Sequence, residues 1–138
     1  MIQMGVHDMI WGRLTDSMLI ENGGELSLGS FIHPRAEPEV CFRISKDIKG
    51  EIPLKDLDEY VDGIAAAIEI IDSRFENFKF SLEDVVADNC SSSALVIGEW
   101  KMPSRDVTNL KMTQSFNCEM VAEGSSADIL GDPWKSLQ

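Results

Sequence analysis

The chain has 138 residues, of which 43% are hydrophobic, and it carries a formal net charge of −12. This length predicts one domain at most, and the hydrophobic content is enough for a core, which argues against wholesale disorder. The negative charge argues against nucleic acid and anionic membranes as partners, because its long-range field repels both.

Targeting and cysteine patterns predict a cytoplasmic protein that makes no membrane contact. No apolar run approaches the roughly 20 residues needed to span a bilayer. The first four residues, MIQM, lack the basic start and the apolar stretch of a signal peptide. The cysteines have no CxxC spacing, which favours reduced thiols over a disulfide framework or a zinc site; they are Cys41, Cys90 and Cys118.

The first third of the chain predicts short elements separated by turns. Residues 5–17 combine glycine, aspartate and an aromatic without a clear period, which is typical of an irregular lead-in. Trp11 in this segment is more typical of a packed anchor than of a ligand contact. The Asn22-Gly23-Gly24 turn signal predicts strands around residues 18–20 and 26–32.

Residues 37–45 predict a strand with acidic side chains on one face. The alternation places one set of side chains on each face, Glu37, Glu39, Cys41 and Arg43 against Val40, Phe42 and Ile44. Pro38 cannot donate to a ladder, which favours a sheet edge or a bulge. Two carboxylates at i and i+2 repel each other, so both stay ionised only with a cation between them. From spacing alone, two solvated acids are the more frequent outcome.

A helix and a buried strand are predicted next. Apolar residues recur at helical spacing over 54–64, which predicts an amphipathic helix with an acidic outer face. Residues 65–71 form an apolar run that predicts a buried strand with Glu69 inside it. A carboxylate there is costly to desolvate unless it is paired or bound to a metal, and pairing with Arg74 is an alternative of equal weight.

The second half predicts one capped helix and a hairpin. Residues 81–84 form a capping box that begins a short helix. Residues 88–93 form a small-polar loop before a strand at 94–97, suited either to a site wall that binds a carboxylate or to an ordinary turn. Residues 110–116 and 118–122 predict a hairpin, and a helix begins at 125–130 before GDP interrupts it. This mixture predicts the α+β class, mostly β.

Three stretches resemble a known enzyme group. HPRAEPEV at 33–40, IEIIDSRFENFKF at 68–80 and VVADNCSSS at 85–93 are similar to motifs of the 4-oxalocrotonate decarboxylase / 2-hydroxypenta-2,4-dienoate hydratase group. This group belongs to the fumarylacetoacetate hydrolase-like superfamily. QMGV at 3–6, Gly12 after an aromatic and Gly131-x-Pro133 agree in order and spacing. The resemblance implies a partial fumarylacetoacetate hydrolase-like mixed β-roll or sandwich with a few short helices.

The resemblance also implies a metal site and a substrate site. The family holds Mg²⁺ or Mn²⁺ with two carboxylates of an E-x-E strand and one from the strand before the D-S-R segment. In this chain the matching residues are Glu37, Glu39 and Glu69. The substrate-binding residues expected are Ile10, Trp11, Arg35, Asn89 and Ser91. The family's catalytic lysine has no match in this chain, so the catalytic residue is left unassigned.

The implied activity is that of a lyase acting on a small unsaturated 2-oxo acid. In the decarboxylase, 2-oxohex-3-enedioate (4-oxalocrotonate) chelates the metal and loses CO₂ to give 2-oxopent-4-enoate or 2-hydroxypenta-2,4-dienoate, during meta-cleavage degradation of aromatics. In the hydratase, the chelate is tautomerised and adds water. Hydratases tend to carry Asp where this chain has Ile10, and DSRFENFKF is more similar to decarboxylases. Decarboxylation is therefore favoured, with the hydratase reaction as the alternative.

The chain also departs from the family pattern. Family members are roughly twice as long, with a lysine segment and C-terminal strands that have no match here. We therefore expect residues 1–138 to be a single, incomplete catalytic-domain fragment that carries the metal-binding strands and is weakly active or inactive.

We also expect the chain to form a homo-oligomer or to associate with a related hydratase or decarboxylase subunit. The competing hypothesis is that the chain is a non-catalytic partner of a full-length relative. A carbon–carbon hydrolase would need an upstream His–Glu arrangement that this chain lacks.

Overall fold

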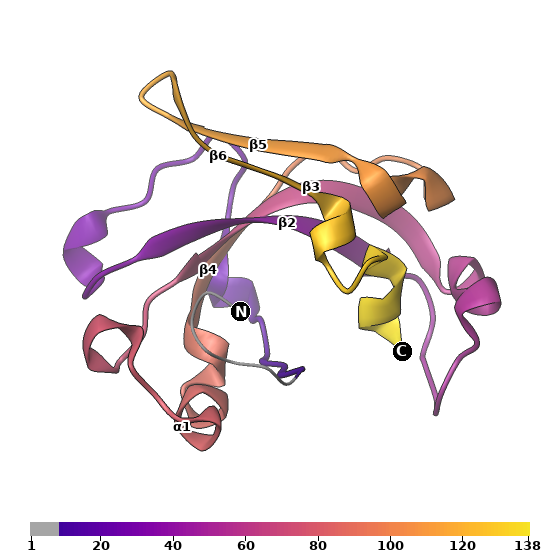
Figure 1. The fold of residues 1–138 in the computed structure, drawn as a ribbon, viewed down its shortest axis with the longest axis horizontal. Helices are drawn as coiled ribbons and strands as arrows, with labels where there is room; N and C mark the ends of the chain where they lie inside the picture. Colours follow the sequence, from indigo (N-terminus) through magenta and orange to yellow (C-terminus); the bar gives the residue numbers. More distant parts are fainter. Residues whose placement is uncertain (1–8) are drawn as a thin grey trace. The chain divides into compact units, whose positions relative to one another are not determined.

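A computed structural model describes residues 9–138, and most of its regular structure is strand (Figure 1). The strands are β1 (Leu19–Ile20), β2 (Arg35–Ile44), β3 (Val61–Ile71), β4 (Ser92–Ile97), β5 (Lys111–Phe116) and β6 (Glu119–Ser125). The α-helix is α1 (Leu82–Ala87). Short 3₁₀ helices connect them, namely η2 (Asp16–Met18), η3 (Leu28–Ser30), η4 (Leu54–Glu59), η5 (Glu76–Phe78), η6 (Asn89–Ser91), η7 (Arg105–Asn109), η8 (Ser126–Asp128) and η9 (Pro133–Leu137).

The described strands form two sheets. The larger sheet has the order β1-β4-β3-β2, and β1 runs parallel to β4 with Leu19 opposite Leu95. The smaller sheet is the antiparallel hairpin β5–β6, which is irregular between Gln114 and Ser115. The long strands β2 and β3 are neighbours in the larger sheet, so side chains on one face of β2 can meet side chains of β3.

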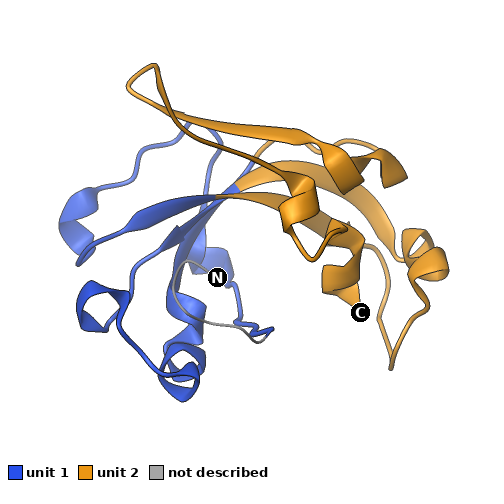
Figure 2. Cartoon of the chain, in the orientation of Figure 1, with its two compact units in different colours: residues 1–37, 68–97 blue, residues 38–67, 98–138 orange. Residues whose placement is uncertain are grey.

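The chain forms two compact units, shown in different colours in Figure 2. Unit 1 comprises the described residues up to Glu37 together with Ile68–Ile97, and unit 2 comprises Pro38–Ala67 and Gly98–Gln138. In unit 2 the core is a cluster of Ile52, Leu57, Val61, Ile64, Val107 and Trp134. In unit 1 the buried apolar side chains include Ile71, Phe78, Val85 and Ala94. Unit 1 also buries several polar side chains, including Asp72, Asp88 and Ser91. The Asp72 carboxylate accepts from the His33 amide, and the Ser91 hydroxyl donates to the Asp88 carboxylate.

Several predicted elements are confirmed. Strands lie at β1, β2 and β4, and the predicted hairpin is β5–β6, with β6 extending to Ser125. Helix α1 begins after Ser81, whose hydroxyl accepts a hydrogen bond from the Asp84 amide, as the capping box predicts. The helix expected from residue 125 is only the single turn η8, and a second turn, η9, follows the glycine at 131.

The predicted helix over 54–64 is wrong in its second half. Helix η4 ends at Glu59, and β3 begins at Val61. Val61 and Ile64 are buried in the core of unit 2 as strand residues. The apolar residues of 54–64 have helical spacing because two different elements, η4 and β3, direct apolar side chains into one core. Gly63, between Val61 and Ile64, disfavours a helix there.

Two other predictions near the start of the chain are wrong. Residues 26–32 form no strand but contain η3, and Ile32 is 66% exposed, because small residues such as Ser27 and Gly29 favour a turn. Trp11 is not a packed anchor, since it is 75% exposed. No helix among residues 9–138 is long and apolar enough to cross a membrane.

Candidate functional site

Three glutamates gather on the neighbouring strands β2 and β3. Glu37 and Glu39 lie two positions apart on β2, so they share a face, and Glu69 lies on β3. One carboxylate oxygen from each of the three lies within 4.8 Å of the other two, and all three residues are partly buried. The structure therefore brings together the three residues that the sequence predicts as metal ligands.

The surroundings of this cluster make a charged Glu37 less favourable when no cation is bound. Burial raises the pKa of Glu37, the charge of Glu69 raises it further, and the charge of Arg35 lowers it. Oxygens that share one cation at about 2.0–2.6 Å each are at most about 4–5 Å apart, which matches the observed spacing. A set of three carboxylates suits a hard divalent cation that keeps positions open for water or substrate oxygens.

Glu69 is held by Ser92, which is not one of the predicted site residues but lies in the small-polar stretch at 88–93. The Ser92 hydroxyl, at the start of β4, donates a hydrogen bond to Glu69 Oε1. Arg74, the alternative partner considered for Glu69, is directed elsewhere: its guanidinium forms an ion pair with Asp88 and donates to the Asp88 and Asp72 carbonyls. Glu69 thus accepts a hydrogen bond from a neutral donor, and Arg74 is bound to other groups.

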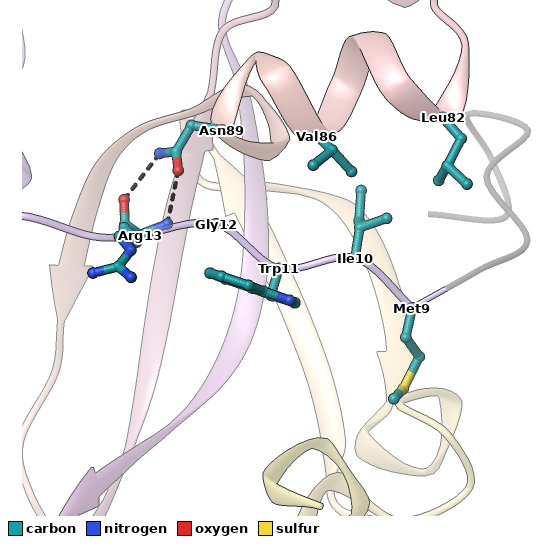
Figure 3. A pocket seen from close by; sticks show the side chains of 8 residues that line it. All are labelled: Met9, Ile10, Trp11, Gly12, Arg13, Leu82, Val86 and Asn89. Carbon is teal, nitrogen blue, oxygen red and sulfur yellow. Dashed lines mark hydrogen bonds between the residues drawn. The ribbon is translucent and has the colours of Figure 1, made fainter.

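A pocket of ≈390 Å³ in unit 1 contains three of the predicted substrate-binding residues (Figure 3). Its lining consists of Met9, Ile10, Trp11, Gly12, Arg13, Leu82, Val86 and Asn89. The Ile10 side chain points toward Val86 of α1, whereas Trp11 extends to the other side of its segment. Among the described residues, the lining includes none of the three glutamates and neither Arg35 nor Ser91.

Asn89 fixes the segment that carries Ile10 and Trp11. Its side-chain amide accepts a hydrogen bond from Arg13 N (2.7 Å) and donates one to Arg13 O (2.9 Å), as drawn in Figure 3. The approach is so close that a Cβ on Gly12 would lie 2.7 Å from Asn89 O. Asn89, Cys90 and Ser91 all have positive φ, at 52°, 58° and 60°. Such conformations cost about 1–3 kcal/mol each and are concentrated at functional sites.

The other two predicted substrate-binding residues have structural partners. The Arg35 guanidinium lies over the Phe78 ring, 3.9 Å from its centroid. Ser91 is only 1% exposed, and its hydroxyl donates to Asp88 Oδ2 at 3.0 Å.

Asp72 is not one of the predicted site residues, although its carboxylate is buried in unit 1. It accepts hydrogen bonds from the amides of Ile32 and His33. These partners are 40 and 39 residues away along the chain, so no local pattern indicates them. The available signal was the position of Asp72 directly after an apolar strand.

Comparison with known proteins yields one family match. The family model described as "Fumarylacetoacetate (FAA) hydrolase C-terminal" matches residues 7–138. The predicted resemblance is thereby confirmed, and the mixed, mostly β fold agrees with it.

Individual proteins with similar sequences or structures are 4-oxalocrotonate decarboxylases and a dienoate hydratase. The chain is 50% identical to a 4-oxalocrotonate decarboxylase of a Pseudomonas species, over 99% of this chain and 54% of that protein. It is 35% identical to a 2-hydroxyhexa-2,4-dienoate hydratase of Comamonas testosteroni, over 97% of this chain and 53% of that protein. A solved 4-oxalocrotonate decarboxylase from Pseudomonas putida G7, complexed with magnesium and adipate, superposes with a TM-score of 0.88 at 35% identity. That match covers 98% of this chain and 52% of the solved chain. The chain thus spans about half the length of the relatives it matches.

Proposed function

Because the chain belongs to the fumarylacetoacetate hydrolase C-terminal family, we propose that Glu37, Glu39 and Glu69 together bind one divalent cation, Mg²⁺ or Mn²⁺. The observation that carries this proposal is the convergence of three carboxylate oxygens within 4.8 Å of one another. A solved relative was complexed with magnesium, which supports a hard cation as the occupant.

Titration calorimetry with Mn²⁺ tests the site. Glu39→Gln should weaken binding about tenfold, or about 1.4 kcal/mol, because one charged ligand is lost. A variant with all three glutamates changed to Gln should show no binding. Glu119→Gln, which removes one exposed charge from β6, is the control and should bind as the wild type does. Equal binding by the wild type and the triple variant would contradict the site.

We further propose that a protein containing this chain is a lyase that decarboxylates 2-oxohex-3-enedioate. When bound, the cation supplies Lewis-acid polarisation of the oxygens of a 2-oxo acid. The three glutamates hold it, and Ser92 orients Glu69 through its hydroxyl. Ile10, Leu82 and Val86 contribute apolar side chains to the pocket. Such side chains offer no group that would hold an attacking water, which favours loss of CO₂ over hydration.

The hydratase reaction is the second candidate, since the relatives include a dienoate hydratase at 35% identity. The two reactions differ in whether water must reach the conjugated chain. In a full-length context, Ile10→Asp should increase hydration relative to CO₂ release, because a carboxylate holds water beside the pocket wall. Product analysis by NMR measures this ratio. An unchanged ratio would remove Ile10 as a determinant of the reaction.

The 138-residue chain by itself is expected to be less active than a protein that contains it. We propose that it is an incomplete catalytic fragment, with slow or no turnover, because no residue matches the family's catalytic lysine. Positioned acid–base groups contribute roughly 10²–10⁴-fold. The assay follows loss of the conjugated chromophore of 2-oxohex-3-enedioate with Mg²⁺ present. Turnover of about 10 s⁻¹, the median for enzymes, would contradict this proposal.

We also propose that the chain self-associates or binds a related subunit. The hairpin β5–β6 has only two strands, and it exposes three large apolar side chains, Phe116, Met120 and Val121. A two-stranded sheet is marginal by itself and presents unpaired edges. Light scattering of the purified chain, by itself and with a full-length decarboxylase or hydratase, tests this. A monodisperse monomer in both samples would contradict it.

A further inference from the structure

Asp72 connects three segments of unit 1. It is the first residue after β3, three positions beyond Glu69, and it is 6% exposed. Its Oδ2 accepts from the Ile32 amide at 2.9 Å, and its Oδ1 accepts from the His33 amide at 2.8 Å. Its own amide donates to the Ser91 carbonyl at 2.8 Å.

Each of these segments is followed in the sequence by a residue that belongs to the glutamate cluster or contacts it. Ile32 and His33 immediately precede β2, where Glu37 lies four residues after His33. Ser91 precedes Ser92, whose hydroxyl donates to Glu69. His33 adds a second connection, since its Nε2 donates to the Ser73 carbonyl at 2.9 Å. Because the Ile32 side chain is mostly exposed, apolar packing of that side chain does not hold its amide in place.

We propose that Asp72 is a positioning residue for the cation site, an inference that rests on the proposed function. Both of its carboxylate oxygens bind backbone amides, so it holds the start of β2 against the end of β3 and thereby sets Glu37 beside Glu69. Hydrogen bonds to a charged acceptor are stronger than neutral ones. In Asp72→Asn, one oxygen becomes an NH₂ group that faces an amide N–H, so one of the two bonds is lost.

Ser126→Ala is the matched control variant. Ser126 is fully buried in unit 2, and its hydroxyl also joins two backbone segments, accepting from Leu110 N at 2.7 Å and donating to Val107 O at 2.6 Å. Both variants thus remove a buried polar connection. Circular dichroism with urea measures stability, and Mn²⁺ titration is made where both variants are folded.

Asp72→Asn should weaken Mn²⁺ binding 10–100-fold, the usual range for residues that orient metal ligands. Ser126→Ala should keep the wild-type affinity even where its loss of stability is similar. Wild-type affinity in Asp72→Asn, or an equal loss of affinity in Ser126→Ala, would overturn the proposal.

Hydrogen exchange of the metal-free wild-type protein, measured by NMR, tests the same contact without any metal or variant. The amides of Ile32 and His33 should exchange more slowly than the neighbouring amides of residues 25–29. Exchange of both at the rate of unstructured amides would overturn the role of Asp72. If the wild type binds no Mn²⁺ while these amides are protected, the cation site itself is refuted, and with it the role of Asp72 in positioning that site. Protected amides together with metal binding that Asp72→Asn weakens would support both proposals.

Discussion

At the scale of single residues, the space around two glycines differs sharply. A Cβ on Gly12 would lie 2.7 Å from Asn89 O, whereas a Cβ on Gly29 would have Ser27 Oγ, at 3.7 Å, as its nearest neighbour. We expect Gly12→Ala to lower the free energy of unfolding by about 1–3 kcal/mol, because backbone must move to admit the methyl group. Gly29→Ala should change it by less than about 0.5 kcal/mol. Urea denaturation followed by circular dichroism measures both.

The comparison also tests how the segment with Ile10 and Trp11 is held. If Gly12→Ala is as stable as the wild type, the segment does not pack against Asn89 as described. If Gly29→Ala is equally destabilised, the loss reflects removal of a glycine in general and not the close approach to Asn89.

At the scale of elements, helix α1 depends on its first turn. Ser81 Oγ accepts from Asp84 N at 3.2 Å, and Asp84 Oδ2 accepts from Ser81 N at 3.0 Å. The helix places Val85 in the core and Leu82 and Val86 in the pocket wall. A six-residue helix is too short to be stable by itself, so its cap and its packing decide whether it forms.

Ser81→Ala should therefore lower the free energy of unfolding by about 1 kcal/mol, since an amide at the helix start loses its acceptor. Ser27 offers a control, because it precedes η3 but its side chain makes no capping hydrogen bond. Ser27→Ala should be nearly neutral. Chemical denaturation of the two variants side by side measures the difference, and equal stabilities would show that the Ser81 cap contributes nothing.

At the scale of the whole molecule, two tryptophans have opposite environments. Trp134 is fully buried in the core of unit 2, with its ring 4.9 Å from that of Phe42 and the Arg105 guanidinium 4.4 Å from its centroid. Among the described residues, nothing accepts a hydrogen bond from its indole Nε1. Trp134 thus stabilises unit 2 through its volume, whereas Trp11 is 75% exposed.

Trp134→Ala should lower the free energy of unfolding by about 3–5 kcal/mol, through lost burial and the cavity left behind. Trp11→Ala should lower it by less than about 1 kcal/mol. Thermal denaturation of both variants ranks them. A larger loss for Trp11→Ala would show that the environments of the two side chains in the native state are not those described.

The sequence by itself determined the features whose causes lie within a few residues. The capping box at 81–84 predicted α1, and the two stretches at 110–116 and 118–122 predicted the β5–β6 hairpin. The alternation over 37–45 predicted β2 with both acids on one face, and the motifs predicted three glutamates that the structure brings together, while their role as metal ligands stays a prediction. The structural predictions succeeded because capping, turn formation and strand alternation are local, while the motifs carry the resemblance that the family match confirms.

Tertiary structure decided the features that depend on distant partners. The sequence could not show that η4 ends at Glu59, because the spacing of Val61 and Ile64 fits a helix as well as a strand entering the same core. No pattern of neighbouring residues predicts that Trp11 is exposed. Nor does any predict the hydrogen bonds that Asp72 accepts from a segment about 40 residues earlier. Burial and buried hydrogen bonds are properties of pairs of segments, and their energies are defined only once the chain has brought those segments together.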